Sequence, residues 1–235
     1  MSSLGLAPFL LDDKKYSSHE VIEVLSPLLT DSRLEKMHQV LDNRCWSVAP
    51  VLENIYDRGN VSAVMRSAEA FGFCNFNIIE REGAKFKESQ RVTQGTDKWL
   101  CTKKFKKTKD CVTQLKSQGF KVYVTDLESA KPISEIDFTH PAAIVFGNEK
   151  EGASDEIKKV ADATFILPML GFAQSFNISV AAALTFQFIY LERIKNLGQH
   201  ADLSGEQKNE LLAHYMIKSL DRSHLILKEK LTHPV

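Results

Sequence analysis

Short apolar runs alternate with amphipathic stretches from residue 47 to residue 197, and this order predicts strands separated by helices. Apolar runs of strand length lie at 47–53, 76–80, 121–125, 142–146 and 164–167. Strands that alternate with helices usually pair in parallel, and helices then cover both faces of the sheet. The chain is therefore predicted to be an α/β protein with a parallel sheet.

Helices are predicted in the gaps, where apolar residues recur at spacings of three and four. The stretch 61–71 has such an apolar face, and Gly72 follows it where a left-handed C-cap is expected. Two further helices are expected at 110–118 and 154–161. The segment 179–196 is almost wholly apolar in its first turns, so we expect a buried helix there.

Both ends of the chain are predicted to be helical extensions, at 1–46 and 198–235, around a central domain at 47–197. The capping-box pattern that starts helices is matched by Ser17 with Glu20, Ser32 with Glu35, and Ser204 with Gln207. The last helix carries an apolar stripe that includes Leu212, Met216, Leu220 and Leu227. A single helix cannot bury such a stripe, so it must pack on the rest of the chain or on a second subunit.

The distribution of charge is informative in one segment only. The 235 residues include 30 basic and 30 acidic side chains, so the overall charge indicates no particular partner. Lysines and arginines are concentrated between residues 85 and 109, with Phe86, Trp99 and Phe105 among them. Such a segment suits a phosphate backbone, and a solvated loop or helix face explains it equally well.

The cysteines and histidines indicate neither a metal site nor a disulfide framework. Cys45, Cys74, Cys101 and Cys111 lack paired CxxC spacing, and the seven histidines are scattered singly. No apolar run approaches membrane-spanning length, and the N-terminus has neither a signal-peptide pattern nor an arginine-rich transit pattern. We therefore expect a cytoplasmic protein with reduced cysteines, no metal and no membrane partner.

Polar side chains that could carry chemistry occur in three segments, each after a predicted strand. They supply Asn60 and Arg66, then Glu149, then Ser175 and Asn177. In a parallel sheet these segments would converge, because ligands gather beyond the carboxyl ends of the strands. Arg66 follows apolar helix residues and could bind a phosphate with its guanidinium fork. Ordinary alternatives exist: Asn60, Ser175 or Asn177 could be helix N-caps, and Glu149 could lie in a simple polar turn.

Several common enzyme motifs are missing. The sequence contains no G-x-G-x-x-G after its first strand, no G-x-x-x-x-G-K-[ST], no G-x-S-x-G and no H-E-x-x-H. Dinucleotide, nucleoside triphosphate, serine hydrolase and zinc protease functions therefore lack support.

The three polar segments closely resemble, in order and spacing, the motifs of the SpoU branch of the SPOUT methyltransferases. These enzymes use S-adenosylmethionine to methylate ribose 2'-hydroxyls of RNA. Motif one, N-x-S-A-x-x-R, is matched by Asn60, Ser62, Ala63 and Arg66. Motif two, F-G-x-E-x-x-G, is matched by Phe146, Gly147, Glu149 and Gly152. Motif three, P-M-x-G followed by Q-S-x-N-x-S-V-A, is matched from Pro168 to Ala181.

The resemblance covers residues 47–195 and is greatest to the TrmH type, the tRNA guanosine 2'-O-methyltransferases that act in the D loop. It implies a deep trefoil knot in the C-terminal part of the domain, which is an exception to the usual connection rules. It also implies a homodimer with the active site at the subunit interface. Two alternatives stay open: a ribosomal RNA 2'-O-methyltransferase of the same fold, and a non-catalytic scaffold that binds RNA.

The resemblance further implies roles for individual residues. The cofactor would be enclosed by Thr125, Gly147, Leu167, Met169, Leu170 and Phe176. The family assigns catalysis to the arginine that matches Arg66, and a guanidinium is almost never deprotonated, so we expect it to anchor an RNA phosphate. Asn60, Glu149, Ser175 and Asn177 would position Arg66, the substrate and the cofactor loop. Arg193 and Lys195 match basic positions implicated in tRNA binding.

Overall fold

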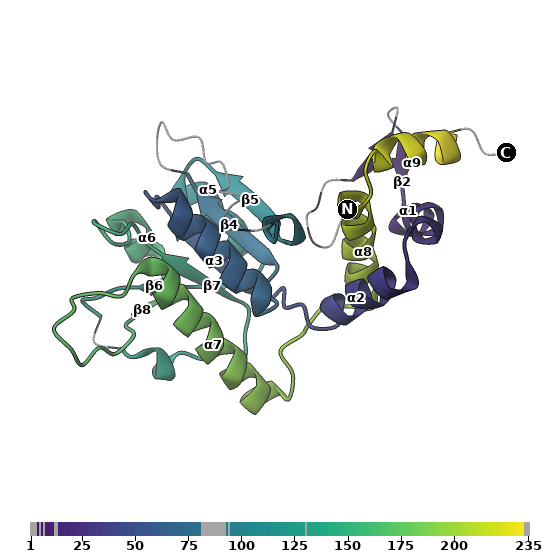
Figure 1. Cartoon of the computed structure of the whole chain (residues 1–235). Coiled ribbons are helices and arrows are strands. Elements are labelled where there is room, and N and C mark those ends of the chain that lie inside the picture. The colour runs from purple at the N-terminus through teal and green to yellow at the C-terminus, as the bar shows by residue number, and fades with distance from the viewer. Residues whose placement is uncertain are drawn as a thin grey trace. The chain divides into compact units, whose positions relative to one another are not determined.

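The chain forms two compact units in the computed structural model, which describes residues 4, 6, 8–11, 14–80, 93, 95–129 and 131–232. One unit, Cys45–His200, is the α/β domain, and the other joins Met1–Arg44 to Ala201–Val235. The two ends of the chain thus meet in one helical unit (Figure 1).

The α/β domain is built on a six-stranded sheet with the order β5-β4-β3-β7-β6-β8. All of its neighbouring strands are parallel, which confirms the predicted sheet. The strands are β3 (Val48–Glu53), β4 (Asn75–Ile79), β5 (Cys101–Phe105), β6 (Lys121–Thr125), β7 (Ala142–Phe146) and β8 (Ala163–Phe165). The chain runs outward in one direction from β3 and in the other from β7, so a topological switch point lies between these two strands.

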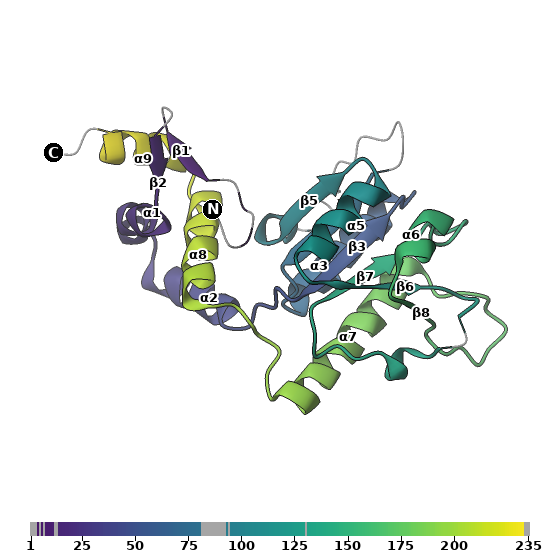
Figure 2. The same cartoon turned by 180° about the vertical axis from the view of Figure 1, so that it is seen from behind.

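Helices cover both faces of this sheet, as predicted. One face is covered by α3 (Arg58–Ala70) and α7 (Ile178–Leu197), and the other by α5 (Thr108–Ser117) and α6 (Asp155–Val160) (Figures 1 and 2). Strand β7 serves both cores: Ile144 and Phe146 face α3 and α7, while Val145 faces α5 and α6. Short 3-10 turns occupy η2 (Asp97–Trp99) and η3 (Ile133–Glu135). The trefoil knot stays a prediction.

Helix α7 corrects one expectation, because only one side of it is buried. Ala182, Phe186 and Ile189 pack into the core with α3. Along the opposite side, 40–55% of the surface of Val180, Leu184, Leu191 and Ile194 is exposed. A sequence that is apolar all round predicts burial all round, but no described residue of this chain covers that second side.

Strand β5 was missed because it lies within the basic segment. Lys103 and Lys104 interrupt its apolar residues, and charged side chains of this kind protect edge strands from pairing with another chain. The segment is therefore, in part, an edge strand rather than a loop or helix face. Residues 81–92 and 94 of the same region lie outside the described residues.

The unit formed by the chain ends contains β1 (Phe9–Leu11), β2 (Lys14–Tyr16), α1 (Ser18–Leu25), η1 (Ser26–Leu28), α2 (Asp31–Leu41), α8 (Gly205–Ser219) and α9 (Ser223–Thr232). Helix α8 packs on α1 and α2. The apolar stripe of the last helical region is therefore buried within the chain, with Leu212, Met216 and Leu227 each at most 3% exposed. Arg222 has φ 56° and separates α8 from α9, so the single predicted helix is two.

Two of the three predicted capping boxes are confirmed, at Ser17 and Ser204. The third is wrong: α2 is capped by Thr30, whose hydroxyl accepts a hydrogen bond from the Arg33 N–H, and Ser32 lies inside the helix. Thr30 fits because its extended backbone lets its side chain reach the first free N–H groups. The β1–β2 hairpin was not predicted.

All four cysteines are buried free thiols. Among the described residues, no cluster of histidine, cysteine and carboxylate side chains could hold a metal ion. None of the described helices is both long enough and apolar enough to cross a membrane.

Candidate active site

A cavity of about 430 Å³ lies beyond the carboxyl ends of β6, β7 and β8. Its walls come from the start of the β6–η3 connection, from the loop after β7 and from the segment between β8 and α7. They include Thr125, Gly147, Glu149, Leu167, Met169, Ser175, Phe176 and Asn177. The second and third polar segments of the sequence therefore converge as expected, because parallel strands bring their carboxyl ends to one edge.

Gly147 allows the loop after β7 to fold back on itself. A Cβ at this position would lie 2.1 Å from the backbone nitrogen of Ala153, so no larger residue fits without displacing the backbone. Asn148 and Gly152 close the loop with two backbone hydrogen bonds of 2.8 and 2.9 Å. Gly152 has φ +71°, which favours glycine. This tight loop fixes the position of Glu149 at the cavity wall.

Glu149 binds three donors in the first motif and just before it. Its carboxylate accepts hydrogen bonds from the Tyr56 N–H at 3.0 Å, the Asp57 N–H at 3.3 Å and the Asn60 side-chain amide at 2.9 Å. Partial burial raises the pKa of Glu149, but the hydrogen bonds from Asn60 and the backbone outweigh it and hold the pKa below its usual value. Glu149 is therefore an ionised anchor at neutral pH and a weak proton acceptor.

Asn60 joins this anchor to the third motif. Its side-chain oxygen accepts a hydrogen bond of 3.1 Å from the Asn177 amide. The Asn177 oxygen accepts from the N–H and the hydroxyl of Ser179, at 2.8 and 2.6 Å, and so caps α7. The chain Glu149–Asn60–Asn177 thus connects all three motifs by side-chain contacts. Asn60 is not an N-cap, because Asp57 caps α3.

Arg66 stands apart from this network. It lies on α3 with an exposed side chain, and no hydrogen bond or ion pair joins it to any described residue of the chain. It is not among the residues that line the cavity. The described residues therefore leave the guanidinium available to a binding partner.

Most residues expected to hold the cofactor line the cavity. Thr125, Leu167, Met169 and Phe176 do so beside the backbone of Gly147, and the Thr125 hydroxyl donates to the Val145 carbonyl at 3.1 Å. Leu170 does not line the cavity and is fully exposed. Apolar walls in a cavity of this size fit an adenosyl group.

The two basic residues expected to bind RNA differ in environment. Arg193 is 3% exposed, and its guanidinium donates to the carbonyls of Phe138 and His200 at 3.1 and 3.3 Å. That arrangement argues against contact between Arg193 and RNA. Lys195 is exposed, and its Nζ lies 3.5 Å from Oε1 of Glu192.

Sequence reasoning missed Glu53, a carboxylate that is 1% exposed at the end of β3. It accepts hydrogen bonds from the Thr108 hydroxyl at 2.8 Å and from the N–H and hydroxyl of Ser154 at 2.9 and 2.7 Å. Ser154 follows the tight loop and caps α6, so Glu53 holds the end of that loop. A charged residue closing a buried strand was the only signal available in the sequence.

The carboxyl edge of the parallel sheet carries a tight glycine-containing loop, a hydrogen-bonded glutamate and a capped helix. These features define an α/β protein with a small-molecule site. Residues 47–187 match the SpoU rRNA Methylase family, and the chain belongs to that family.

Two relatives of this family match most of the chain. The sequence is 31% identical over 191 residues to the tRNA (guanosine(18)-2'-O)-methyltransferase of Aquifex aeolicus (strain VF5), covering 80% of this chain and 90% of the relative. The crystal structure of the A. aeolicus TrmH/SpoU tRNA modifying enzyme has a TM-score of 0.75 and 29% identity, covering 82% of this chain and 98% of that chain.

A more distant structure shares the fold. The SpoU methyltransferase AviRb from Streptomyces viridochromogenes, solved with the cofactor AdoMet, has a TM-score of 0.57 and 20% identity, covering 66% of this chain and 61% of that chain.

Proposed function

We propose that this protein methylates a ribose 2'-hydroxyl of tRNA, at a guanosine of the D loop, with S-adenosylmethionine as methyl donor. The Glu149–Asn60–Asn177 network carries the proposal, because it assembles three separate motifs beside one cavity. The tRNA substrate is supported by the names of the relatives that match most of the chain.

The cavity residues divide the work of holding the cofactor. Leu167, Met169 and Phe176 supply apolar walls, and Gly147 lines the cavity without a side chain. When bound, S-adenosylmethionine supplies an electrophilic methyl group. Asn177 and Ser175 lie on the same wall, at the start of α7, where they can orient the reacting groups.

Arg66 has the chemistry to anchor and stabilise the RNA. Its planar guanidinium can bind a phosphate through two parallel hydrogen bonds. Glu149 is occupied by three donors and is ionised, so we assign it to positioning of Asn60 and the loop after β7. Alignment of the ribose hydroxyl with the methyl donor then supplies much of the rate enhancement.

We further propose a homodimer in which α7 contributes to the interface and the active site is shared. Val180, Leu184, Leu191 and Ile194 lie along one side of α7 and are exposed in the single chain. Apolar stripes of this kind mark association surfaces. Arg66 lies outside the cavity lining of its own chain, so a partner subunit's cavity is a natural place for it to act.

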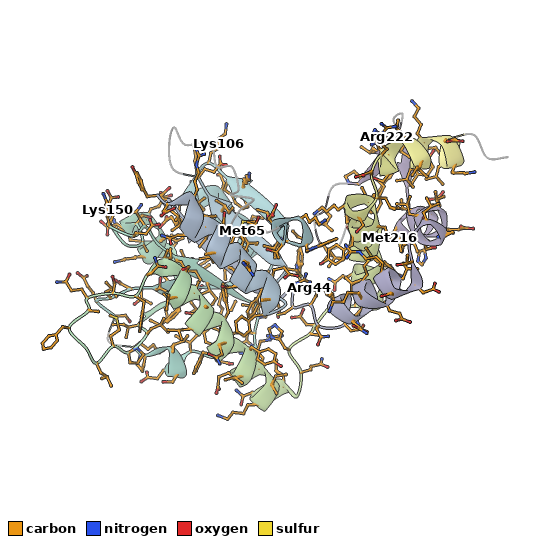
Figure 3. All side chains as sticks on the ribbon, viewed as in Figure 1. Arg44, Met65, Lys106, Lys150, Met216 and Arg222 are labelled. Carbon is orange, nitrogen blue, oxygen red and sulfur yellow. The ribbon has the colours of Figure 1, made fainter. Side chains whose placement is uncertain are left out.

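Exposed lysines supply the RNA-binding charge in this proposal. Lys195 lies near the end of α7, and Lys106, Lys107 and Lys109 lie between β5 and the first turn of α5 (Figure 3 labels Lys106). A tRNA substrate and four free thiols fit a cytoplasmic enzyme, as the sequence predicts.

Ribose-methylation mapping tests the proposal directly. The purified protein is incubated with S-adenosylmethionine and with unmodified tRNA or ribosomal RNA, and the modified nucleotide is located in each. We expect methylation of a D-loop guanosine in tRNA. Methylation of ribosomal RNA alone would contradict the tRNA assignment and support the first alternative. No methylation, and no cofactor binding in a calorimetric titration, would instead support the scaffold.

A salt titration of tRNA binding tests the role of the lysines. Each phosphate contact lowers the logarithm of the binding constant by about 0.7–0.9 per unit of log salt. We expect a steep decline, and an affinity independent of salt would contradict the assignment of phosphate contacts.

A further inference from the structure

Tyr56 and Lys150 form an exposed aromatic and cationic pair at the candidate active site. Tyr56 follows β3 and is 66% exposed, which is unusual for a large aromatic side chain. Lys150 lines the cavity from the loop after β7, and its ammonium lies 5.6 Å from the centre of the Tyr56 ring. This distance is typical of a cation–π interaction. Figure 3 labels Lys150 on that loop, between β7 and α6.

The same network that assembles the site holds the backbone of both residues. The Tyr56 N–H donates to Glu149 at 3.0 Å, and the Lys150 N–H donates to the Asn148 side chain at 2.8 Å. Asn148 in turn donates to the Asn54 carbonyl at 2.7 Å, which ties the loop after β7 to the end of β3. The backbone of Tyr56 is therefore held in place, while the residue is 66% exposed and the Lys150 ammonium lies over its ring.

A nucleotide matches this pair better than a protein surface does. A nucleobase stacks on an aromatic face without requiring an apolar surround, and an ammonium beside the ring can meet the adjoining phosphate. The residues after Tyr56, Asp57 and Arg58, are exposed and charged. An apolar protein partner would instead need a wider hydrophobic patch.

We propose that Tyr56 and Lys150 form a nucleotide subsite for the RNA substrate, in which a base stacks on Tyr56 and Lys150 contacts a phosphate. The inference rests on the proposed function, since an RNA that reacts in the cavity must pass its mouth. The base belongs to the target nucleotide or to one beside it. Because Tyr56 does not line the cavity, its ring adds affinity for RNA and none for S-adenosylmethionine.

Paired substitutions of Tyr56 test the stacking. Tyr56→Leu keeps an apolar side chain but removes the ring, whereas Tyr56→Phe keeps the ring and removes only the hydroxyl. Stacking of a base on an aromatic side chain is lost in the first variant, so we expect tRNA affinity and the KM for tRNA to worsen by about tenfold. Tyr56→Phe is expected to lose far less. Similar losses in both variants, or in neither, would overturn the stacking.

Lys150→Gln tests the phosphate contact. It should weaken tRNA binding and make the slope of log affinity against log salt shallower by about one. An unchanged slope would overturn the role of Lys150. Calorimetric titration with S-adenosylmethionine checks each variant, and a large loss of cofactor affinity would show that the pair acts through the cavity instead.

Failure of the subsite and failure of the proposed function give different results. If the unsubstituted protein methylates tRNA while Tyr56→Leu binds it normally, the subsite is wrong and the function stands. If the unsubstituted protein neither binds nor methylates tRNA, the function fails and the subsite with it. Sedimentation of each variant shows whether the pair is instead a contact between two copies of the chain, in which case the subsite would also be wrong.

Discussion

Arg66 is an exposed guanidinium with no partner among the described residues, and the proposed chemistry depends on it. We predict that Arg66→Ala lowers methyl transfer to tRNA by about a hundredfold or more, as removal of a preorganised charged donor does elsewhere. Binding of S-adenosylmethionine should persist, because Arg66 does not line the cavity. Single-turnover methylation and calorimetric titration measure the two effects.

Arg66→Lys is the matched control for this prediction. It keeps the charge but loses the planar fork that binds phosphate bidentately, so we expect a rate between those of the alanine variant and the unsubstituted protein. Turnover close to normal in Arg66→Ala would rule out a role for this residue in the reaction.

Residue types explain which parts of the site could be read from the sequence. Asn60, Glu149 and Asn177 were predicted as site residues because they match the motifs. In the structure, hydrogen bonds join them. Glu53 and Tyr56 were not predicted as site residues. Their importance comes from contacts to Ser154 and Glu149, 101 and 93 positions away in the chain, and no local pattern encodes such contacts.

At the scale of elements, Glu53 connects the end of β3 to the first residues of α5 and to the N-cap of α6. We predict that Glu53→Gln destabilises the fold by about 1–3 kcal/mol, because its amide group would face hydroxyl and N–H donors in a buried site. The loop that carries Gly147 and Glu149 ends beside Ser154, so cofactor affinity should fall too. Urea unfolding and calorimetric titration measure these changes.

Ser154→Ala serves as the comparison, since it removes one donor to Glu53 together with the hydroxyl that caps α6. It should lose cofactor affinity in the same direction as Glu53→Gln. If both variants are destabilised but bind S-adenosylmethionine normally, Glu53 supports the fold without positioning the loop.

A second prediction at this scale concerns α8 and pH. Burial, with a smaller contribution from Lys218, lowers the pKa of His214 to about 4. The centres of the His214 and Phe9 rings lie 4.6 Å apart, and the rings are tilted by 38°. In the unfolded chain the histidine pKa is about 6.5. The unfolded state therefore binds the proton first as the pH falls, and stability is lost between about pH 6.5 and pH 4, by up to about 3 kcal/mol.

Urea unfolding at pH 7 and pH 5 measures this dependence, and His214→Phe should remove most of it. His224→Gln, an exposed histidine of α9 in the same unit, should leave it in place. An equal pH dependence in the unsubstituted protein and in His214→Phe would contradict the assignment to His214.

Strands and helices with a regular apolar pattern were predictable, whereas exposed edges and exposed helix faces were not. The central strand β3 is buried at every position and was predicted from its apolar run. The edge strand β5 was missed, since its lysines break the apolar pattern where one side of the strand has no neighbour. In the same way, the sequence of α7 does not distinguish a helix buried on all sides from one that leaves a face for a partner.

At the scale of the whole molecule, that exposed face of α7 is the strongest structural argument for a dimer. Among the described residues, those of the α/β unit leave Val180, Leu184, Leu191 and Ile194 uncovered, although α7 lies next to the cavity through Asn177. A two-fold interface built on α7 would pair the same surface of both copies. It would also bring each cavity near the second copy, which would present its own Arg66 there.

We therefore predict that the double substitution Leu184→Glu and Leu191→Glu converts the protein to a monomer with little methyltransferase activity. Two carboxylates buried in an apolar interface would cost several kcal/mol, enough to prevent association at micromolar concentration. Leu28→Glu with Leu225→Glu is the control, since these leucines are as exposed, at 50% and 51%, but lie outside α7. Sedimentation gives the mass, and tRNA methylation gives the activity. A variant that is monomeric yet fully active would show that one chain contains the whole site, and Arg66 would then have to reach the cavity of its own subunit.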